Sequence, residues 1–93
     1  MITTLKVGGW PSALAHNPAN NQIYCTDYGS DEVTIIDGVG DSVRATLKVG
    51  LSPSALAYNS GNNKIYCANR KGSSVSVIAC APPTVTDLNR KNK

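Results

Sequence analysis

The chain has few of the residues that an enzyme or metal site requires. Among its 93 residues there is one histidine, His16, and none of the three cysteines has the C-x-x-C spacing of a zinc ligand set. A catalytic histidine needs a nucleophile or a carboxylate held against it, and no motif here supplies one. We therefore expect no catalytic residue, no metal site and no cofactor, and we predict that the chain is not an enzyme.

Long apolar runs and a strong charge imbalance are also absent. No stretch approaches the ~18 apolar residues of a membrane span, and no basic region followed by an apolar segment opens the chain. We expect neither a membrane span nor a secretion signal, and the localisation stays unknown. The formal charge of +3 comes from Arg90, Lys91 and Lys93, since the remaining bases and acids balance, so we expect no nucleic-acid partner.

The chain does contain an internal repeat. Residues 4–36 recur at a fixed offset of 42 as residues 46–78, with 18 of 33 positions identical and no gap. Short β-like segments separated by turns, at a period in this range, are typical of four-stranded propeller blades. Repeats of this kind are stable by stacking and usually need at least about three units. With two repeats, either partner chains supply further blades or the chain is part of a longer protein.

Four strands are expected in each repeat. The first three are residues 12–16, 22–26 and 32–36, with copies at 54–58, 64–68 and 74–78. The linkers NPANN and NSGNN suit tight hairpins, because asparagine tolerates a left-handed backbone and can bond to its own main chain. The fourth strand, residues 42–49, joins the repeats, and a related segment, residues 2–7, opens the chain without a blade of its own.

The second repeat is expected to lack its fourth strand. Pro82 and Pro83 follow the last predicted strand, and proline weakens a ladder because it cannot donate a backbone hydrogen bond. We therefore assign residues 1–80 to two tandem repeats, about 4–45 and 46–80. Residues 81–93 are predicted to form a proline-containing basic tail without fixed structure.

Two tetrapeptides carry a family resemblance. Tyr24-Cys25-Thr26-Asp27 and Tyr66-Cys67-Ala68-Asn69, each about ten residues after P-S-A-L-A, resemble the motif that names the YVTN-type β-propeller repeat, with Cys in place of Val. The resemblance covers about residues 2–80, and the Gly-His and Trp-Asp marks of the WD-type repeat are absent. It implies an all-β fold of seven or eight blades, often in cell-surface or secreted binding proteins. Similar blades occur in lactonase-like enzymes and in haem-binding domains of nitrite reductases.

A way of assembly follows from the strand count. Residues 2–7 of one chain could complete the second blade of the next, a head-to-tail contact that forms a ring if the rotation closes. Three chains would give six blades and four would give eight. Charge is consistent with this homo-oligomer: residues 1–45 carry Lys6 and Arg44 against five carboxylates, whereas residues 46–88 carry four bases against Asp87. Independent drift of two loops explains the same pattern.

The cysteines are expected to pack rather than react. Cys25 and Cys67 occupy equivalent positions of adjacent blades, beyond disulfide reach, and replace an apolar residue of the motif. Cys80, next to the proline-rich tail, is expected to be the most exposed thiol. His16 and its equivalent Tyr58 should lie at the end of the innermost strand with their polar tips near the channel.

The loops offer candidate binding residues. Trp10, whose equivalent is Ser52, should lie beside Tyr28 and the acidic loop, since the two loops concerned share one face of the disc. Packing of Trp10 over a neighbouring blade is an equal alternative. Asp27, Asp31 and Glu32 match no calcium-loop spacing and are expected to be solvated. The candidates for ligand or partner binding are Trp10, Asp27, Tyr28, Asp31, Glu32, Arg70 and Lys71.

Together these features predict a non-catalytic β-propeller scaffold or binding module that self-assembles head to tail through exchange of its N-terminal strand. Its loop face could take a protein or a small-molecule ligand. The alternative is a fragment of a larger propeller enzyme, lactonase-like or haem-binding, or of a cell-surface protein.

Overall fold

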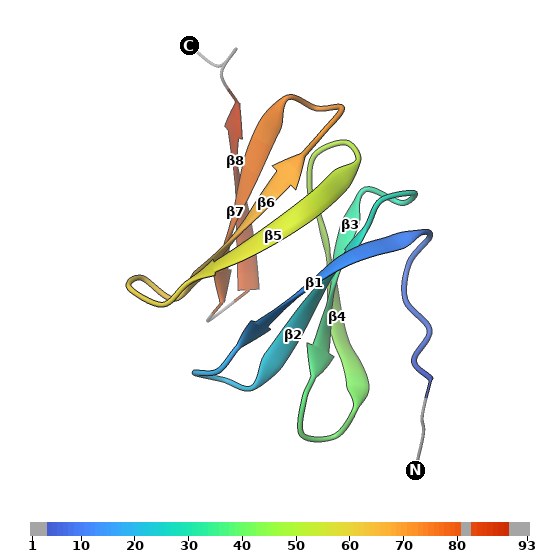
Figure 1. Cartoon of the computed structure of the whole chain (residues 1–93), viewed down its shortest axis with the longest axis vertical. Coiled ribbons are helices and arrows are strands. Elements are labelled where there is room, and N and C mark those ends of the chain that lie inside the picture. Colours follow the sequence, from blue (N-terminus) through green and yellow to red (C-terminus); the bar gives the residue numbers. More distant parts are fainter. Residues whose placement is uncertain (1–3, 81–82, 90–93) are drawn as a thin grey trace.

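The computed structural model describes residues 4–80 and 83–89, whose strands form two four-stranded antiparallel sheets (Figure 1). The first sheet contains, in spatial order, β1 (Pro11–Asn17), β2 (Gln22–Asp27), β3 (Glu32–Asp37) and β4 (Ser42–Lys48). The second contains β5 (Pro53–Asn59), β6 (Lys64–Asn69), β7 (Ser74–Cys80) and β8 (Pro83–Asn89). None of the described residues is helical, so none belongs to a helix long and apolar enough to cross a membrane. The predicted all-β class is confirmed, and the sheets are consistent with two blade-like units.

Each strand from β1 to β7 begins directly after a residue with a left-handed backbone. Their φ angles lie between 50° and 62°, and none of them is glycine: Trp10, Asn21, Asp31, Asp41, Ser52, Asn63 and Ser73. A type I turn followed by one left-handed residue is a common hairpin connection. Three of the left-handed positions recur at the offset of 42, as Trp10 and Ser52, Asn21 and Asn63, and Asp31 and Ser73, so the repeat in the sequence is also a repeat of backbone conformation.

Asparagine and aspartate side chains hold several of these turns. Oδ1 of Asn17, Asp37 and Asn59 each accepts a hydrogen bond of 2.9 Å from the backbone N–H two residues further on. Each of these residues is the last of its strand. Such local bonds start the turn without help from the rest of the fold. The turn chemistry predicted for the two asparagine-rich linkers is confirmed.

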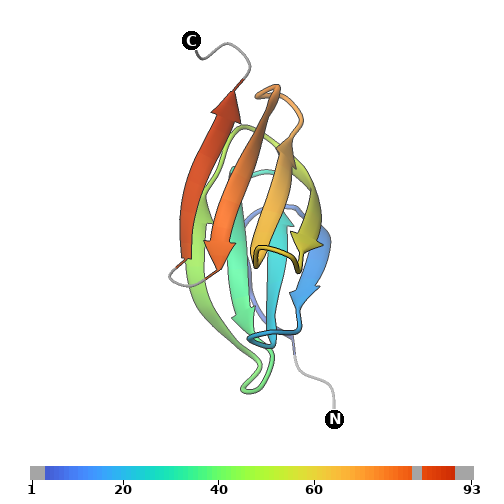
Figure 2. The ribbon, with the colours of Figure 1, turned by 90° about the vertical axis from the view of Figure 1, so that its left-hand side faces the viewer.

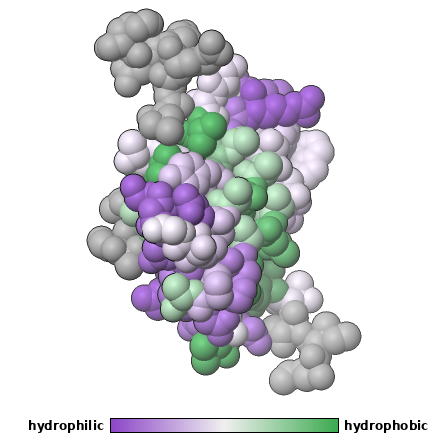
Figure 3. Space-filling view, turned by 60° about the vertical axis from the view of Figure 1, so that its left-hand side comes forward, coloured by the Kyte–Doolittle hydropathy of each residue, from purple (hydrophilic) through white to green (hydrophobic). Residues whose placement is uncertain are grey.

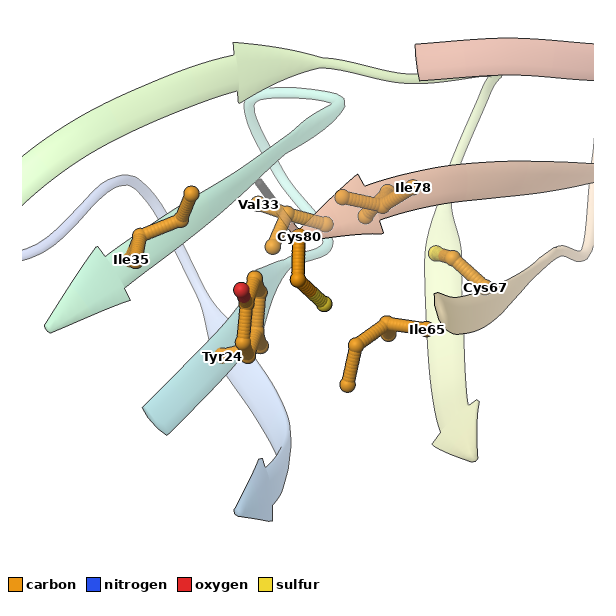
Figure 4. Packing of buried hydrophobic residues seen from close by; sticks show 7 residues of the cluster. All are labelled: Tyr24, Val33, Ile35, Ile65, Cys67, Ile78 and Cys80. Atoms are coloured by element: carbon orange, nitrogen blue, oxygen red, sulfur yellow. The ribbon is translucent and has the colours of Figure 1, made fainter. Parts of the chain in front are cut away.

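The two sheets pack face to face, and the core is the layer of side chains between them (Figures 2 and 4). The first sheet contributes Tyr24, Val33 and Ile35. The second contributes the buried residues Ile65, Cys67, Ile78 and Cys80. All seven have at most 4% of their surface exposed. This interface between sheets is therefore the main apolar core of the chain.

The sheets present opposite faces to this interface. Tyr24 points into the core from β2, whereas its equivalent Tyr66 does not, and β6 contributes Ile65 and Cys67 instead. Successive side chains of a strand point to opposite sides of the sheet. Each sheet therefore has one face in the core and one face directed away from it.

The second sheet has four strands, so the prediction that it lacks its fourth strand is wrong. Residues 83–89, assigned there to a tail without structure, form β8 and pair with β7 from Cys80↔Pro83 to Ser74↔Asn89. The proline argument was wrong because Pro83 is the first residue of an outermost strand, where a missing N–H donor is tolerated. Residues 81, 82 and 90–93 lie outside the described part of the chain.

The expected N-terminal strand is also absent where the structure describes it. Residues 4–7 are not assigned to a strand, and residues 2 and 3 lie outside the described part. The outer position of the second sheet, which this segment was expected to fill from another chain, is occupied by β8. The premise for strand exchange is therefore wrong. The other predicted strands are confirmed, with ends that differ by one or two residues.

Candidate functional site

Two aromatic side chains meet on the loops of the first sheet. The ring centroids of Trp10 and Tyr28 lie 5.6 Å apart with an interplanar angle of 67°, an edge-to-face contact. Trp10 is 73% exposed, so it does not pack over the second sheet. The predicted neighbourhood of Trp10 and Tyr28 is confirmed, and within this chain Trp10 is not covered by the second sheet.

Main-chain hydrogen bonds hold this aromatic pair. The N–H of Tyr28 donates to the carbonyl of Trp10, and the N–H of Gly29 donates to that of Gly9, both at 2.9 Å. Trp10 has a φ of 62°, which is unusual for a bulky residue. The loop bonds thus fix an exposed tryptophan in a conformation that it would not adopt alone.

Asp27 is buried, so the prediction that it is a solvated loop residue is wrong. Its side chain is 0% exposed, and Thr34 Oγ1 donates to Asp27 Oδ2 at 2.6 Å. The Cys25 thiol donates to Asp27 Oδ1 at 3.7 Å. A Cβ atom on Gly8 would lie 2.8 Å from Asp27 Cγ. The carboxylate is therefore enclosed by the protein, where it accepts hydrogen bonds from Thr34 and Cys25 and does not contact solvent.

The second sheet repeats this arrangement with an amide. Asn69 Nδ2 donates to Ser76 Oγ at 2.8 Å, and the Cys67 thiol donates to Asn69 Oδ1 at 3.6 Å. Gly50 takes the place of Gly8, with a would-be Cβ 2.7 Å from Asn69 Nδ2. Because the same geometry recurs without a charge, we interpret Asp27 as a structural residue.

Asp31 and Glu32 have different roles. Asp31 Oδ1 accepts from the Ser52 N–H, next to the first strand of the second sheet, at 2.8 Å. The Asp31 carbonyl accepts from the Val49 N–H at 3.1 Å, directly after the pairing of β3 with β4. Glu32 lies 3.7 Å from Lys48 in an ion pair whose side chains are 26% and 77% exposed. Such exposed pairs contribute about 0–1 kcal/mol.

Arg70 and Lys71 belong to the other sheet. They are exposed and lie in the turn between β6 and β7, where the Arg70 N–H donates to the Ser52 carbonyl at 2.9 Å. This bond repeats the one between Tyr28 and Trp10. The described residues contain no group of three or more His, Cys, Asp or Glu side chains that could hold a metal ion.

His16 and Tyr58 make the same local contact. His16 Nε2 lies 3.1 Å from Asn21 Oδ1, and Tyr58 Oη donates to Asn63 Oδ1 at 3.0 Å. Each side chain leaves the end of the first strand of its sheet and meets the asparagine that precedes the second strand. Their shared role is to close a hairpin.

The buried thiols differ from expectation at one position. Cys25 and Cys67 are buried, as predicted, but Cys80 is also buried and lies beside Tyr24 in the core (Figure 4). The prediction of an exposed Cys80 was wrong because Cys80 ends β7 inside the sheet contact. Burial and the neighbouring Cys80 raise the pKa of Tyr24 to about 12. Burial and the Asp27 carboxylate raise the pKa of Cys25 to about 11.

The first sheet has an apolar face that the core does not cover. We call Leu14, Ile23, Cys25, Ile36 and Val43 the open face of the first sheet; strand register places them on one side. Leu14 is 68% and Val43 43% exposed. A hollow of about 370 Å³ lies on this face, lined by Pro11, Ser12, Ala13, Leu14 and Cys25.

The second sheet has a corresponding face. Tyr66, Val75 and Val77 form what we call the open face of the second sheet, and Val75 is 36% exposed. The second sheet lies in front of the first in Figure 2, and Figure 3, from a similar side, shows a band of apolar residues between hydrophilic loops. The sequence analysis did not predict either open face. The repeat was the available signal, since it gives both sheets nearly the same apolar residues.

Comparison with known proteins adds no relative. The chain matches no protein-family model, and no curated protein matches it.

Proposed function

We propose that this chain is a non-catalytic scaffold of the YVTN-type β-propeller kind, which self-assembles head to tail and presents its loops for binding. The proposal is supported by one observation above others: each sheet has an apolar face directed away from the core, and the two open faces come from opposite sides of equivalent sheets. Monomeric proteins rarely expose such patches without a partner for them.

Burial of these faces gives the assembly its driving force. Covering an exposed leucine such as Leu14 stabilises a complex by ~1.5–3 kcal/mol. Stacked repeats gain their stability in this way, and two units fall below the usual minimum of about three. Further units are therefore expected to stabilise the pair.

The assembly that we propose needs no exchange of the N-terminal strand. Since β8 fills the outer position of the second sheet within the chain, contact between copies is left to the sheet faces. Three or four chains would supply six or eight sheets of this kind. The contact pairs unlike surfaces, so it closes into a ring only if the rotation between copies allows it.

Light scattering of the full chain over a range of concentrations tests this function. We expect a mass of three or four times the 9.8 kDa of one chain, and the same mass after deletion of residues 2–7. A compact single chain at every concentration would reject self-assembly. An oligomer that dissociates when residues 2–7 are deleted would indicate that the N-terminal segment takes part in the contact between copies.

The binding part of the proposal concerns the exposed pair of Trp10 and Tyr28. Exposed aromatic side chains on the loops of a rigid scaffold are common binding residues. Arg70 and Lys71, in the equivalent turn of the second sheet, give that turn a basic character. Assembly would place aromatic and basic turns in alternation around the ring.

A further inference from the structure

We infer that the open face of the first sheet binds the open face of the second sheet of another copy, in the geometry that already joins the two sheets within one chain. This inference depends on the proposed self-assembly and names its contact surface. The internal interface supplies the template, since both partners of the new contact are repeat copies of surfaces that already pack together.

Identical residues occur in different environments on the two sheets. The lining of the hollow has as counterparts Pro53, Ser54, Ala55, Leu56 and Cys67, with no difference in residue type. Pro53 and Cys67 are fully buried, and Leu56 packs against the core. In contrast, Leu14 is 68% exposed. The contrast holds for the proline and the leucine: Pro53 is buried and Leu56 is partly buried against the core, whereas Pro11 and Leu14 are exposed.

The apolar residues deeper in the face follow the same rule. Ile23, Ile36 and Val43 correspond to Ile65, Ile78 and Val85, again without a change of type. Ile65 and Ile78 are 0% exposed in the core, whereas Ile23 and Ile36 are only partly buried. The open face of the first sheet therefore has the composition of a surface that packs against another sheet.

The surface that would cover this face is the open face of the second sheet of another copy. Tyr66, Val75 and Val77 correspond to Tyr24, Val33 and Ile35, which are at most 1% exposed and cover the second sheet within the chain. Two of the three are identical, and Val77 is one methylene smaller than Ile35. The covering surface is thus present in every copy.

An asparagine pair forms a hydrogen bond across the internal interface. Asn17, which is 0% exposed, donates through Nδ2 to Asn63 Oδ1 at 3.0 Å. The equivalents, Asn59 and Asn21, are exposed on opposite sheets. A second copy in the template geometry would bring them together. Such a polar pair fixes the register of an apolar contact.

A hydrogen bond from the backbone to a side chain would repeat in the same way. Asp31 Oδ1 accepts from the Ser52 N–H across the internal interface. The equivalents are Ser73 and Trp10, which share the left-handed backbone of the pair that is already joined. The contact between copies would therefore place the turn that carries Arg70 and Lys71 against the loop of Trp10, and would join the basic half of one chain to the acidic half of the next.

Two substitutions separate the two surfaces. Leu14→Asp disables the open face of the first sheet, and Val75→Asp disables that of the second. Each variant alone is expected to be monomeric, with apparent dissociation constants raised roughly 10- to 150-fold or more. Val39→Asp, at an 80% exposed turn residue outside both faces, is the matched control and should keep the wild-type mass.

Mixing the two variants gives the decisive result. The Leu14→Asp chain keeps its second-sheet face and the Val75→Asp chain keeps its first-sheet face, so an equimolar mixture is expected to form a 1:1 dimer that cannot grow. The inference would be overturned by a mixture that stays monomeric, or by either variant alone having the wild-type mass. In both cases an oligomeric wild-type chain would still support the proposed function. A monomeric wild type would overturn both.

Folding of the variants is checked by circular dichroism. If Val75→Asp is unfolded, Val75→Thr replaces it, because threonine keeps the β-branched shape and adds one polar group to the face. The same mixing result is required of the pair Leu14→Ser and Val75→Thr, and monomers in that mixture count against the inference.

Discussion

At the scale of single residues, the buried polar groups are enclosed and partnered rather than poised for chemistry. Asp27 accepts from Thr34 and Cys25, and the equivalent Asn69 accepts from Cys67 and donates to Ser76. Among the described residues, every buried side-chain nitrogen and oxygen has a hydrogen-bond partner. A buried polar group without a partner would cost ~1–3 kcal/mol, so these clusters also fix which packing is acceptable.

The thiol of Cys25 is predicted to be unreactive at pH 8. Its pKa of about 11 lies above the ordinary value of 9.0, so the thiolate, which is the nucleophile, is scarce. Labelling with iodoacetamide, followed by peptide mass spectrometry, should modify all three cysteines only after unfolding in urea. Rapid labelling of Cys80 in the folded chain would contradict its placement in the core.

The same shifts give a pH dependence of stability. Cys25 and Tyr24 have folded pKa values of about 11 and about 12, above the ordinary values of 9.0 and 10.0, so the folded state holds its protons more tightly than the unfolded state. Their contribution is fully present below about pH 9 and is lost as the pH rises toward 12. Urea unfolding between pH 8 and pH 11 measures it, and Cys25→Ala should reduce the loss.

At the scale of elements, the turns are as regular as the strands. Every connection before β1 to β7 ends in a left-handed residue, and three of the connections start with a side-chain bond from the last residue of the preceding strand. Strand register follows from this, because a hairpin turn fixes which residues face each other. The alternation of covered and open faces is thus set locally.

The turn between β3 and β4 offers a matched pair of glycines. A Cβ on Gly38 would lie 2.5 Å from the Asn21 carbonyl oxygen, whereas a Cβ on Gly40 would meet nothing closer than 3.5 Å. Gly38→Ala should destabilise the chain by ~1–3 kcal/mol, since backbone must move. Gly40→Ala should be neutral or stabilise by up to ~1 kcal/mol. Equal effects in urea unfolding would show that the turn is not held against Asn21.

At the scale of the whole molecule, the interface between the two sheets is the main hydrophobic core. The two sheets bury a single apolar layer between them and leave two related surfaces outside it. A unit of this kind can be extended at both ends by the contact that it already contains. The same design explains why the repeat copies differ in exposure although their residues are the same.

Substitution of two equivalent isoleucines, Ile78 and Ile36, tests the difference in burial between the two sheets. Ile78→Ala should cost ~2–5 kcal/mol of unfolding free energy, because Ile78 is 0% exposed between the sheets. Ile36→Ala should cost clearly less at concentrations where light scattering finds one chain, since Ile36 is only partly buried. We expect Ile36→Ala to weaken assembly instead. Equal costs in the dilute chain would mean that both faces are already covered.

Much of the fold could be predicted because its signals are local. Asparagine-rich turns and β-branched runs placed six of the strands and the joining strand, and the shared loop face brought Trp10 to Tyr28. The errors concern positions where local signals oppose the tertiary contact. Pro83 is a poor ladder residue in general but acceptable at the start of β8, and Cys80 is buried because it ends β7 inside the contact between the two sheets.

The sequence by itself determined the four strands of the first sheet, three strands of the second and the turns between them, since neighbouring residues and an offset of 42 are enough to specify them. Only the tertiary structure decided which face of each sheet is covered, that Asp27 is enclosed, and that residues 83–89 complete the second sheet. The physical reason is that burial depends on the surface packed opposite a residue. Identical side chains such as Leu14 and Leu56 therefore have different environments in the same chain.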